Sequence, residues 1–164
     1  MEHQQQRIRN PFVGVEGYHC FGCDPENPAG LKLEFTVVDN QLVIHWDPSS
    51  RFEGYPGVIH GGIQATLADE AAAWYVYTVL GTGGVTQEMR SQFRSPARTE
   101  DGPFTVRASG SPRDSRSADV HVTLENARGT LCTETVCVYV LFPEEIARKR
   151  FDYPGREAFF APGS

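Results

Sequence analysis

The residues best suited to chemistry stand at the entrance to a long apolar stretch, where His60, Gly61 and Gly62 precede residues 63–77. That stretch is rich in alanine and contains neither Pro nor Gly, which predicts a helix entered through the glycine pair. The first N–H groups of a helix have no intrahelical acceptor and carry partial positive charge, so they can hold a developing oxyanion. Paired glycines also permit a tight turn or close helix–sheet packing, and alone they favour that structural interpretation.

Two acids interrupt the apolar stretch. Asp69 lies nine residues after His60 and is surrounded mainly by small side chains. A carboxylate among small residues is poorly solvated, which makes it a stronger base and leaves room for a ligand. The alternative is a buried aspartate bonded to the backbone or to Thr66. Glu70 follows directly and points about 100° away around the helix, so the residues alone do not decide which acid reacts.

Four cysteines are present: Cys20, Cys23, Cys132 and Cys137. The first two have the spacing of a metal-binding knuckle, which would need two further ligands. A second Cys-x-x-Cys pair is missing, and Cys132 and Cys137 are five residues apart in a strand-like run, so they point to opposite faces. We therefore expect packing thiols rather than a metal site, and no cofactor.

Charge limits the partners that the chain can bind. The formal net charge is −6, which argues against nucleic acid, because phosphate backbones need clustered lysines and arginines. The long helix carries acids in its middle, so it is not a membrane span. Residues 1–9 are polar and show no secretory signal, so we expect a cytoplasmic location. Arginines at 90, 94, 98 and 107 either form a local patch for a small anionic ligand or are solvated on strand faces.

The elements that would position these residues follow from periodicity. Gly81 stands just past the end of the helical stretch, where a left-handed cap is common. Alternating apolar residues predict strands at 31–36, 42–46, 85–94, 104–108, 120–124 and 130–142, with a turn at Asp39-Asn40 and a short helix at 143–150. The last strand is apolar on both faces near its end and should lie centrally.

The sum is an α+β fold in which an antiparallel sheet of about six strands wraps around one long central helix. We divide the 164 residues into an N-terminal arm (1–17), one domain (18–142) and a C-terminal short helix and tail (143–164). We expect the tail to pack on a neighbouring surface, of its own chain or of another subunit, with disorder as the alternative. An apolar edge strand commonly pairs with a second copy, so we expect a homodimer or a larger assembly.

Several of these segments together resemble a known family, the hotdog-fold acyl-CoA thioesterases of the phenylacetate-pathway type. The similarity spans roughly residues 18–142. Its most specific part is the spacing from His60-Gly61-Gly62 to Leu67-Ala68-Asp69. Further matching segments are residues 52–59, residues 85–97 and, for one subgroup, Cys20–Cys23 with Asn27-Pro28 and residues 30–33.

The resemblance implies the following roles. Asp69 would be the catalytic carboxylate, acting as general base or as nucleophile, and the Gly61 N–H would stabilise the oxyanion. Thr86 falls where the family has a Ser or Thr that holds the water. Many relatives have an Asn at the position of Gly54; here either His60 takes over its role or the substrate is oriented more loosely.

The resemblance also implies a substrate and an assembly. The chain would hydrolyse an acyl-CoA to free acid and CoA as a dimer or a dimer of dimers, with Asp69 and Thr86 acting across the subunit interface. Gly62 and the arginines at 90, 94 and 98 are candidate substrate-binding residues, the arginines for the CoA phosphates. The alternatives are a hotdog hydratase or dehydratase and a non-catalytic acyl-CoA-binding protein.

Overall fold

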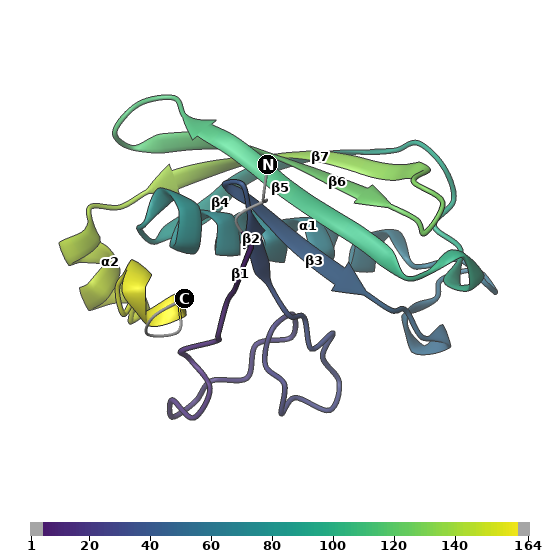
Figure 1. The fold of residues 1–164 in the computed structure, drawn as a ribbon, viewed down its shortest axis with the longest axis horizontal. Helices are drawn as coiled ribbons and strands as arrows, with labels where there is room; N and C mark the ends of the chain where they lie inside the picture. The colour runs from purple at the N-terminus through teal and green to yellow at the C-terminus, as the bar shows by residue number, and fades with distance from the viewer. Residues whose placement is uncertain (1–4, 161–164) are drawn as a thin grey trace.

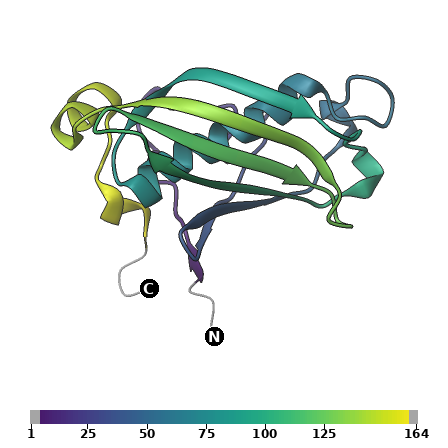
Figure 2. The ribbon, with the colours of Figure 1, turned by 90° about the horizontal axis from the view of Figure 1, so that it is seen from above.

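One antiparallel sheet curves around the long helix α1 (Gly61–Tyr75), as Figures 1 and 2 show. The computed structural model describes residues 5–160. The strands are β1 (Gln5–Arg7), β2 (Thr36–Val38), β3 (Gln41–Trp46), β4 (Gly84–Phe93), β5 (Phe104–Pro112), β6 (Ser117–Glu125) and β7 (Leu131–Leu141). They lie side by side in the order β1-β2-β3-β5-β6-β7-β4. The predicted hotdog architecture is confirmed, with seven strands where about six were expected.

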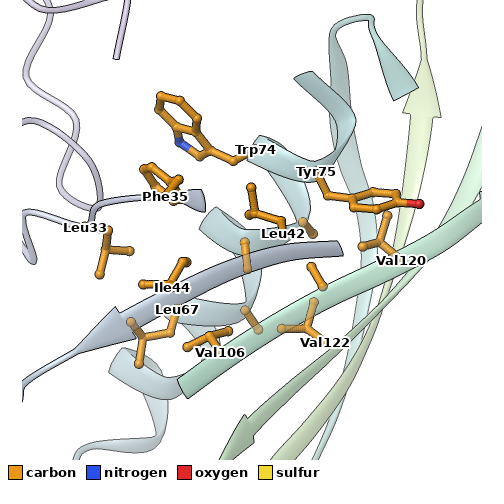
Figure 3. Close-up of a cluster of buried hydrophobic side chains, with 14 of the residues drawn as sticks. Leu33, Phe35, Leu42, Ile44, Leu67, Trp74, Tyr75, Val106, Val120 and Val122 are labelled. Atoms are coloured by element: carbon orange, nitrogen blue, oxygen red, sulfur yellow. The ribbon is translucent and has the colours of Figure 1, made fainter. Parts of the chain in front are cut away.

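Helix α1 is enclosed because most of its surface is apolar. Leu67, Ala71 and Trp74 are almost fully buried, and the Trp74 ring stacks on Phe35 with centroids 4.1 Å apart (Figure 3). The helix continues as a π-helical turn over Val76–Leu80 and ends at Gly81, whose φ of 75° is the left-handed conformation predicted for a cap. The sheet therefore covers one side of α1. Segments near both ends of the chain, which include Phe12 and Phe159, cover Trp74 on another side.

The strand expected over residues 31–36 was wrong. Lys32 has a positive φ of 54°, which interrupts the extended backbone. The N–H groups of Leu31 and Leu33 donate to the carbonyls of Phe21 and Gly22, so this segment pairs with the N-terminal loop and only β2 joins the sheet. The predicted alternation of buried and exposed residues is present in the structure. It arises because the apolar side chains pack against α1, and not because the segment forms a strand.

Strand β7 occupies the interior position expected of it, between β6 and β4. Within residues 5–160, strand β4 is an edge of the sheet: β7 is its only neighbouring strand, and none of its residues is fully buried. Val85 and Phe93 on this strand are 40% and 55% exposed. A long edge with exposed apolar side chains is suited to pairing with another chain.

The C-terminal segment docks on its own chain. Helix α2 (Glu144–Phe151) has the predicted extent, and the residues after it bury Tyr153 and Phe159 against Trp74 and Tyr77 at the end of α1. The expected packing surface is thus intramolecular. Within residues 5–160, no helix has the length and apolarity required to cross a lipid bilayer.

Candidate active site

His60 caps the N-terminus of α1 and leaves the two glycine amides that follow it in different states. Its Nδ1 accepts a hydrogen bond of 2.9 Å from the Gly62 N–H. The hydrogen bonds of residues 5–160 include none donated by the Gly61 N–H. The amide of Gly61 is therefore free to meet a ligand, whereas that of Gly62 is occupied. Because Nδ1 accepts, the neutral His60 ring carries its proton on Nε2.

A tight loop holds His60 in place. Glu53 accepts hydrogen bonds from the Gly57 N–H at 2.9 Å and from the Thr99 hydroxyl at 2.7 Å, and these bonds lower the pKa of its carboxyl. A Cβ at Gly54 would lie 3.1 Å from Cδ2 of His60. The space beside Gly54 at the helix entrance is thus taken by the His60 ring.

The loop, the first turn of α1 and the end of β4 enclose a cleft of about 720 Å³. Its lining includes His60, Gly61, Phe93 and Arg94. Buried Gln64 supports it by donating to the Ile59 carbonyl at 2.9 Å and by accepting from a threonine hydroxyl of β7. Gln64 was not recognised as a site residue from the sequence, although a lone amide in an apolar helical turn is a recognisable signal.

Asp69 and Thr86 meet within one chain. The Thr86 hydroxyl donates to Oδ1 of Asp69 at 2.7 Å. A bulge in the pairing of β4 with β7 follows directly after Thr86, and such bulges redirect side chains beside functional sites. Thr66, considered as a partner of Asp69, donates instead to the Gly62 carbonyl at 2.9 Å. The Asp69–Thr86 contact itself needs no second subunit.

Tyr139 completes this second group and was not recognised from the sequence. It lies opposite Thr86 in the sheet, and its hydroxyl contacts the backbone carbonyl of Asp69 at 3.4 Å. The residue is 2% exposed, and burial raises the pKa of its phenol. A single hydroxyl in the apolar part of β7 was the available signal.

The structure separates the two halves of the predicted site. Gly61 and Asp69 are eight residues apart on one straight helix, which places them about 12 Å apart along its axis. An oxyanion donor and a base must both lie about 3 Å from the reacting group. One chain therefore does not bring Gly61 and Asp69 to the same carbonyl.

The candidate phosphate-binding arginines are exposed and do not form a single patch. Arg90 pairs with Glu88 at 3.2 Å, and Arg94 pairs with Glu134, with Nε at 3.1 Å. Arg94 lines the cleft at the helix entrance, whereas Arg90 lines a different depression on the sheet. Arg98 lies just beyond, in a segment bridged to Val58.

Glu70 faces away from Asp69, toward the N-terminal loop. Its carboxylate lies 3.5 Å from Sγ of Cys20, and burial raises its pKa to about 8. The thiol of Cys23 donates to Cys20 and lowers the pKa of Cys20 to about 6. The structure thus assigns the two acids to different surroundings: Asp69 lies beside the exposed edge strand, and Glu70 lies among thiols. The two remaining cysteines, 132 and 137, are buried elsewhere.

The fold and the sequence around this site define a class of protein. The family model described as the thioesterase superfamily matches residues 56–133, which include the helix entrance, Asp69 and Thr86. The chain carries the hotdog fold, and this central segment is similar to the thioesterase superfamily. A comparison with curated proteins found no match.

Solved structures with the same fold are similar at low identity. A thioesterase superfamily protein, RHA08564, superposes with a TM-score of 0.68 at 21% identity, covering 74% of this chain and 60% of that chain. The PaaI protein of the Escherichia coli phenylacetic acid degradation operon gives 0.61 at 16% identity, covering 70% and 82%. A hypothetical thioesterase from Streptococcus pneumoniae, solved with coenzyme A, gives 0.60 at 20% identity, covering 65% and 84%.

Proposed function

We propose that this chain hydrolyses an acyl-CoA thioester to the free acid and CoA. The observation that carries the proposal is the presence on one helix of a fixed carboxylate and a free helix-entrance amide: Asp69 is held by Thr86, and Gly61 lines a cleft. The thioesterase superfamily match covers both groups. The pneumococcal structure contains coenzyme A, which supports CoA as the leaving group.

The chemistry assigned to each residue follows from its position. Asp69 removes a proton from water as the water oxygen attacks the thioester carbon, or attacks that carbon itself. The Gly61 N–H stabilises the negative charge that develops on the carbonyl oxygen. His60 positions this end of the substrate through its free Nε2–H. The C–S bond then breaks, and the CoA thiolate takes up a proton.

A complete site requires two copies of the chain. Strand β4 runs antiparallel to α1, with Thr86 beside Asp69 at one end and Phe93 beside Gly61 at the other. If two β4 edges pair antiparallel around a two-fold axis, the Thr86 end of one copy lies opposite the Phe93 end of the other. Asp69 of one copy then approaches Gly61 of the second copy. The distance of about 12 Å between Asp69 and Gly61 along a single helix therefore no longer prevents them from acting on one carbonyl.

The substrate would enter along this shared edge. Tyr55 at the rim of the cleft is 83% exposed and Phe93 is 55% exposed, so both offer apolar surface to a second copy or to the substrate. The volume of the cleft, about 720 Å³, is in the usual range of ligand sites. Among the candidate arginines, Arg94 is best placed to bind a CoA phosphate, because it lines the cleft. Arg90, Arg98 and Gly62 do not line the cleft and would contribute less directly to substrate binding.

Thiol release from short, medium, long and aromatic acyl-CoAs tests the proposal. We expect turnover of at least one substrate, and a loss of orders of magnitude in Asp69→Asn. Glu70→Gln is the matched control, because the acid is adjacent but faces the thiols. Full activity of Asp69→Asn with an inactive Glu70→Gln would reverse the assignment. Binding without turnover of every substrate would identify a non-catalytic acyl-CoA-binding protein.

A single turnover in ¹⁸O-labelled water distinguishes the two roles of Asp69. If Asp69 activates water, the label appears in the released acid and not in the protein. If Asp69 attacks the thioester and water then opens the acyl-aspartyl anhydride at the aspartyl carbonyl, the label enters the Asp69 carboxylate, so label in the protein identifies the covalent route; water attack at the acyl carbonyl would instead label only the released acid. Mass spectrometry of the peptide that contains Asp69 gives the answer.

A further inference from the structure

A second cluster of reactive side chains lies on another face of α1, away from Asp69. Sγ of Cys20 is 2.8 Å from Sγ of Cys23 and 3.5 Å from Oε1 of Glu70. The hydroxyl of Tyr18 lies 2.9 Å from Sγ of Cys23. The donor atoms of Cys20, Cys23 and Glu70 all lie within 4.8 Å of one another. Two thiols and a carboxylate therefore converge on one point.

The loop that carries the thiols is shaped for this convergence. The Cys23 N–H donates to Sγ of Cys20 at 3.2 Å, an arrangement that stabilises a thiolate. Asn10 fixes the loop by donating to the Tyr18 hydroxyl and to the Cys23 carbonyl, each at 2.9 Å. A Cβ at Gly22 would lie 2.3 Å from Cδ of Glu70, so glycine is what allows the carboxylate to come this close.

The cluster has no basic partner. Among residues 5–160, none of the ion pairs involves Glu70, and the hydrogen bonds of Cys20, Cys23 and Glu70 include no lysine, arginine or histidine side chain. Cys23 is 6% exposed. Buried acidic groups are costly unless they are paired or coordinate a cation. The described residues therefore supply no positive charge to these three acidic groups.

We propose that Cys20, Cys23 and Glu70 bind one zinc-class divalent cation, which fastens the N-terminal loop to α1. Thiolate sulfur selects zinc over magnesium or calcium, and a Cys-x-x-Cys pair with further ligands is a usual zinc donor set. The sequence favoured packing thiols because it offers no second cysteine pair. The third donor, Glu70, comes from the helix 50 residues along the chain, which only the fold reveals.

Binding requires a small adjustment. Zn–S bonds of about 2.3 Å in a tetrahedron place two sulfurs about 3.8 Å apart, so the thiols must separate by about 1 Å. The fourth position falls to the Tyr18 oxygen or to water. A cavity of about 330 Å³ borders the cluster and is lined by Tyr18, Cys20, Cys23 and Glu70, so water can reach the metal.

Cobalt titration of the full chain tests the proposal without reference to turnover. The reduced protein is stripped with a chelator and titrated with Co²⁺, then with Zn²⁺. We expect one equivalent of Co²⁺ to produce a thiolate-to-cobalt charge-transfer band in the near ultraviolet, and Zn²⁺ to abolish it. Because the band is read from the wild-type chain, this result does not depend on the folding of a variant.

Variants identify the ligands. Cys20→Ser and Cys23→Ser should lose the charge-transfer band, and Glu70→Gln should weaken binding by at least about 10- to 100-fold, the range known for disturbed metal sites. Cys137→Ser is the matched control and should bind like the wild type, since this thiol lies on β7. Circular dichroism confirms that each variant is folded.

Three results would overturn the proposal. The first is a reduced wild-type chain that shows no charge-transfer band at stoichiometric Co²⁺. The second is a band that persists in both Cys20→Ser and Cys23→Ser. The third is a chain that binds no metal and forms a disulfide under mild oxidation with hydrogen peroxide. Its count of free thiols would then fall by two, and its mass would fall by that of two hydrogen atoms. That outcome would identify Cys20 and Cys23 as a redox pair instead.

Discussion

Replacing Gly61 by proline isolates the contribution of one backbone N–H to catalysis. Gly61 is the first residue of α1, the helical position where proline is favoured because its missing N–H would have no intrahelical acceptor. His60 has φ −56° and ψ 136°, an extended conformation that suits a residue before proline. An added Cβ would meet only the Phe93 ring, at 3.5 Å, an ordinary contact. Gly61→Pro should therefore fold with the amide removed.

The expected cost is large because the donor acts where charge develops. Removing one oxyanion donor costs about 10²–10³ in kcat, or roughly 2.7–4 kcal/mol of transition-state stabilisation. Since no hydrogen bond within residues 5–160 is donated by the Gly61 N–H, stability should not fall with it. A gain of about 0.4–1 kcal/mol in the free energy of unfolding is expected from the stiffer unfolded chain.

The assay is thiol release under saturating acyl-CoA, with a thermal melt of each variant. Gly61→Ala is the control: it adds a Cβ beside Phe93 but keeps the N–H, and its kcat should stay close to that of the wild type. If Gly61→Pro is folded and turns over at the wild-type rate, the Gly61 amide is not the oxyanion donor. If both variants are equally impaired, space at the helix entrance matters rather than the amide.

Three further predictions concern the same fold. Equal co-expression of Asp69→Asn and Gly61→Pro chains should restore about a quarter of wild-type activity if each site uses two copies, whereas unchanged inactivity would place the site within one chain. Thr86→Val removes the hydrogen bond to Asp69, worth about 1.5–3 kcal/mol, and should lower kcat about 10- to 100-fold and the melting temperature by a few degrees. Burial raises the pKa of Cys137 to about 12, so at pH 8 iodoacetamide should modify this thiol only after denaturation; rapid labelling of the native chain would contradict its burial.

The strands and the helix could be predicted because they obey local rules. Gly81 takes the left-handed conformation that ends a helix, and Asp39 and Asn40 both adopt the positive φ that a tight hairpin requires. Strand alternation located the four long strands after α1 to within a few residues. The segment 31–36 failed because its alternation arises from packing on the helix, and periodicity does not report which element supplies the contact.

The site was predicted only as a set of residues. The spacing from Gly61 to Asp69 made both residues candidates, but their separation along α1 becomes a constraint only once the helix is seen to be continuous. Tyr139 and Gln64 were missed because their partners, Asp69 and Thr133, are about 70 positions away. The position of Glu70 among thiols could not be predicted either, because the loop that carries Cys20 is irregular. Long-range contacts of this kind depend on the fold.

The position of β4 at the sheet edge determines when the proposed site can form during synthesis. β4 emerges from the ribosome before β5, β6 and β7, yet in the described part of the chain it pairs only with β7, the last of these four strands to be made. Until then Val85 and Phe93 lack a neighbouring strand, and such a segment is prone to aggregate. The Asp69–Thr86 pair is therefore assembled last, so a chain that ends before Leu131 would contain the base and lack the strand pairing that aims Thr86 at it.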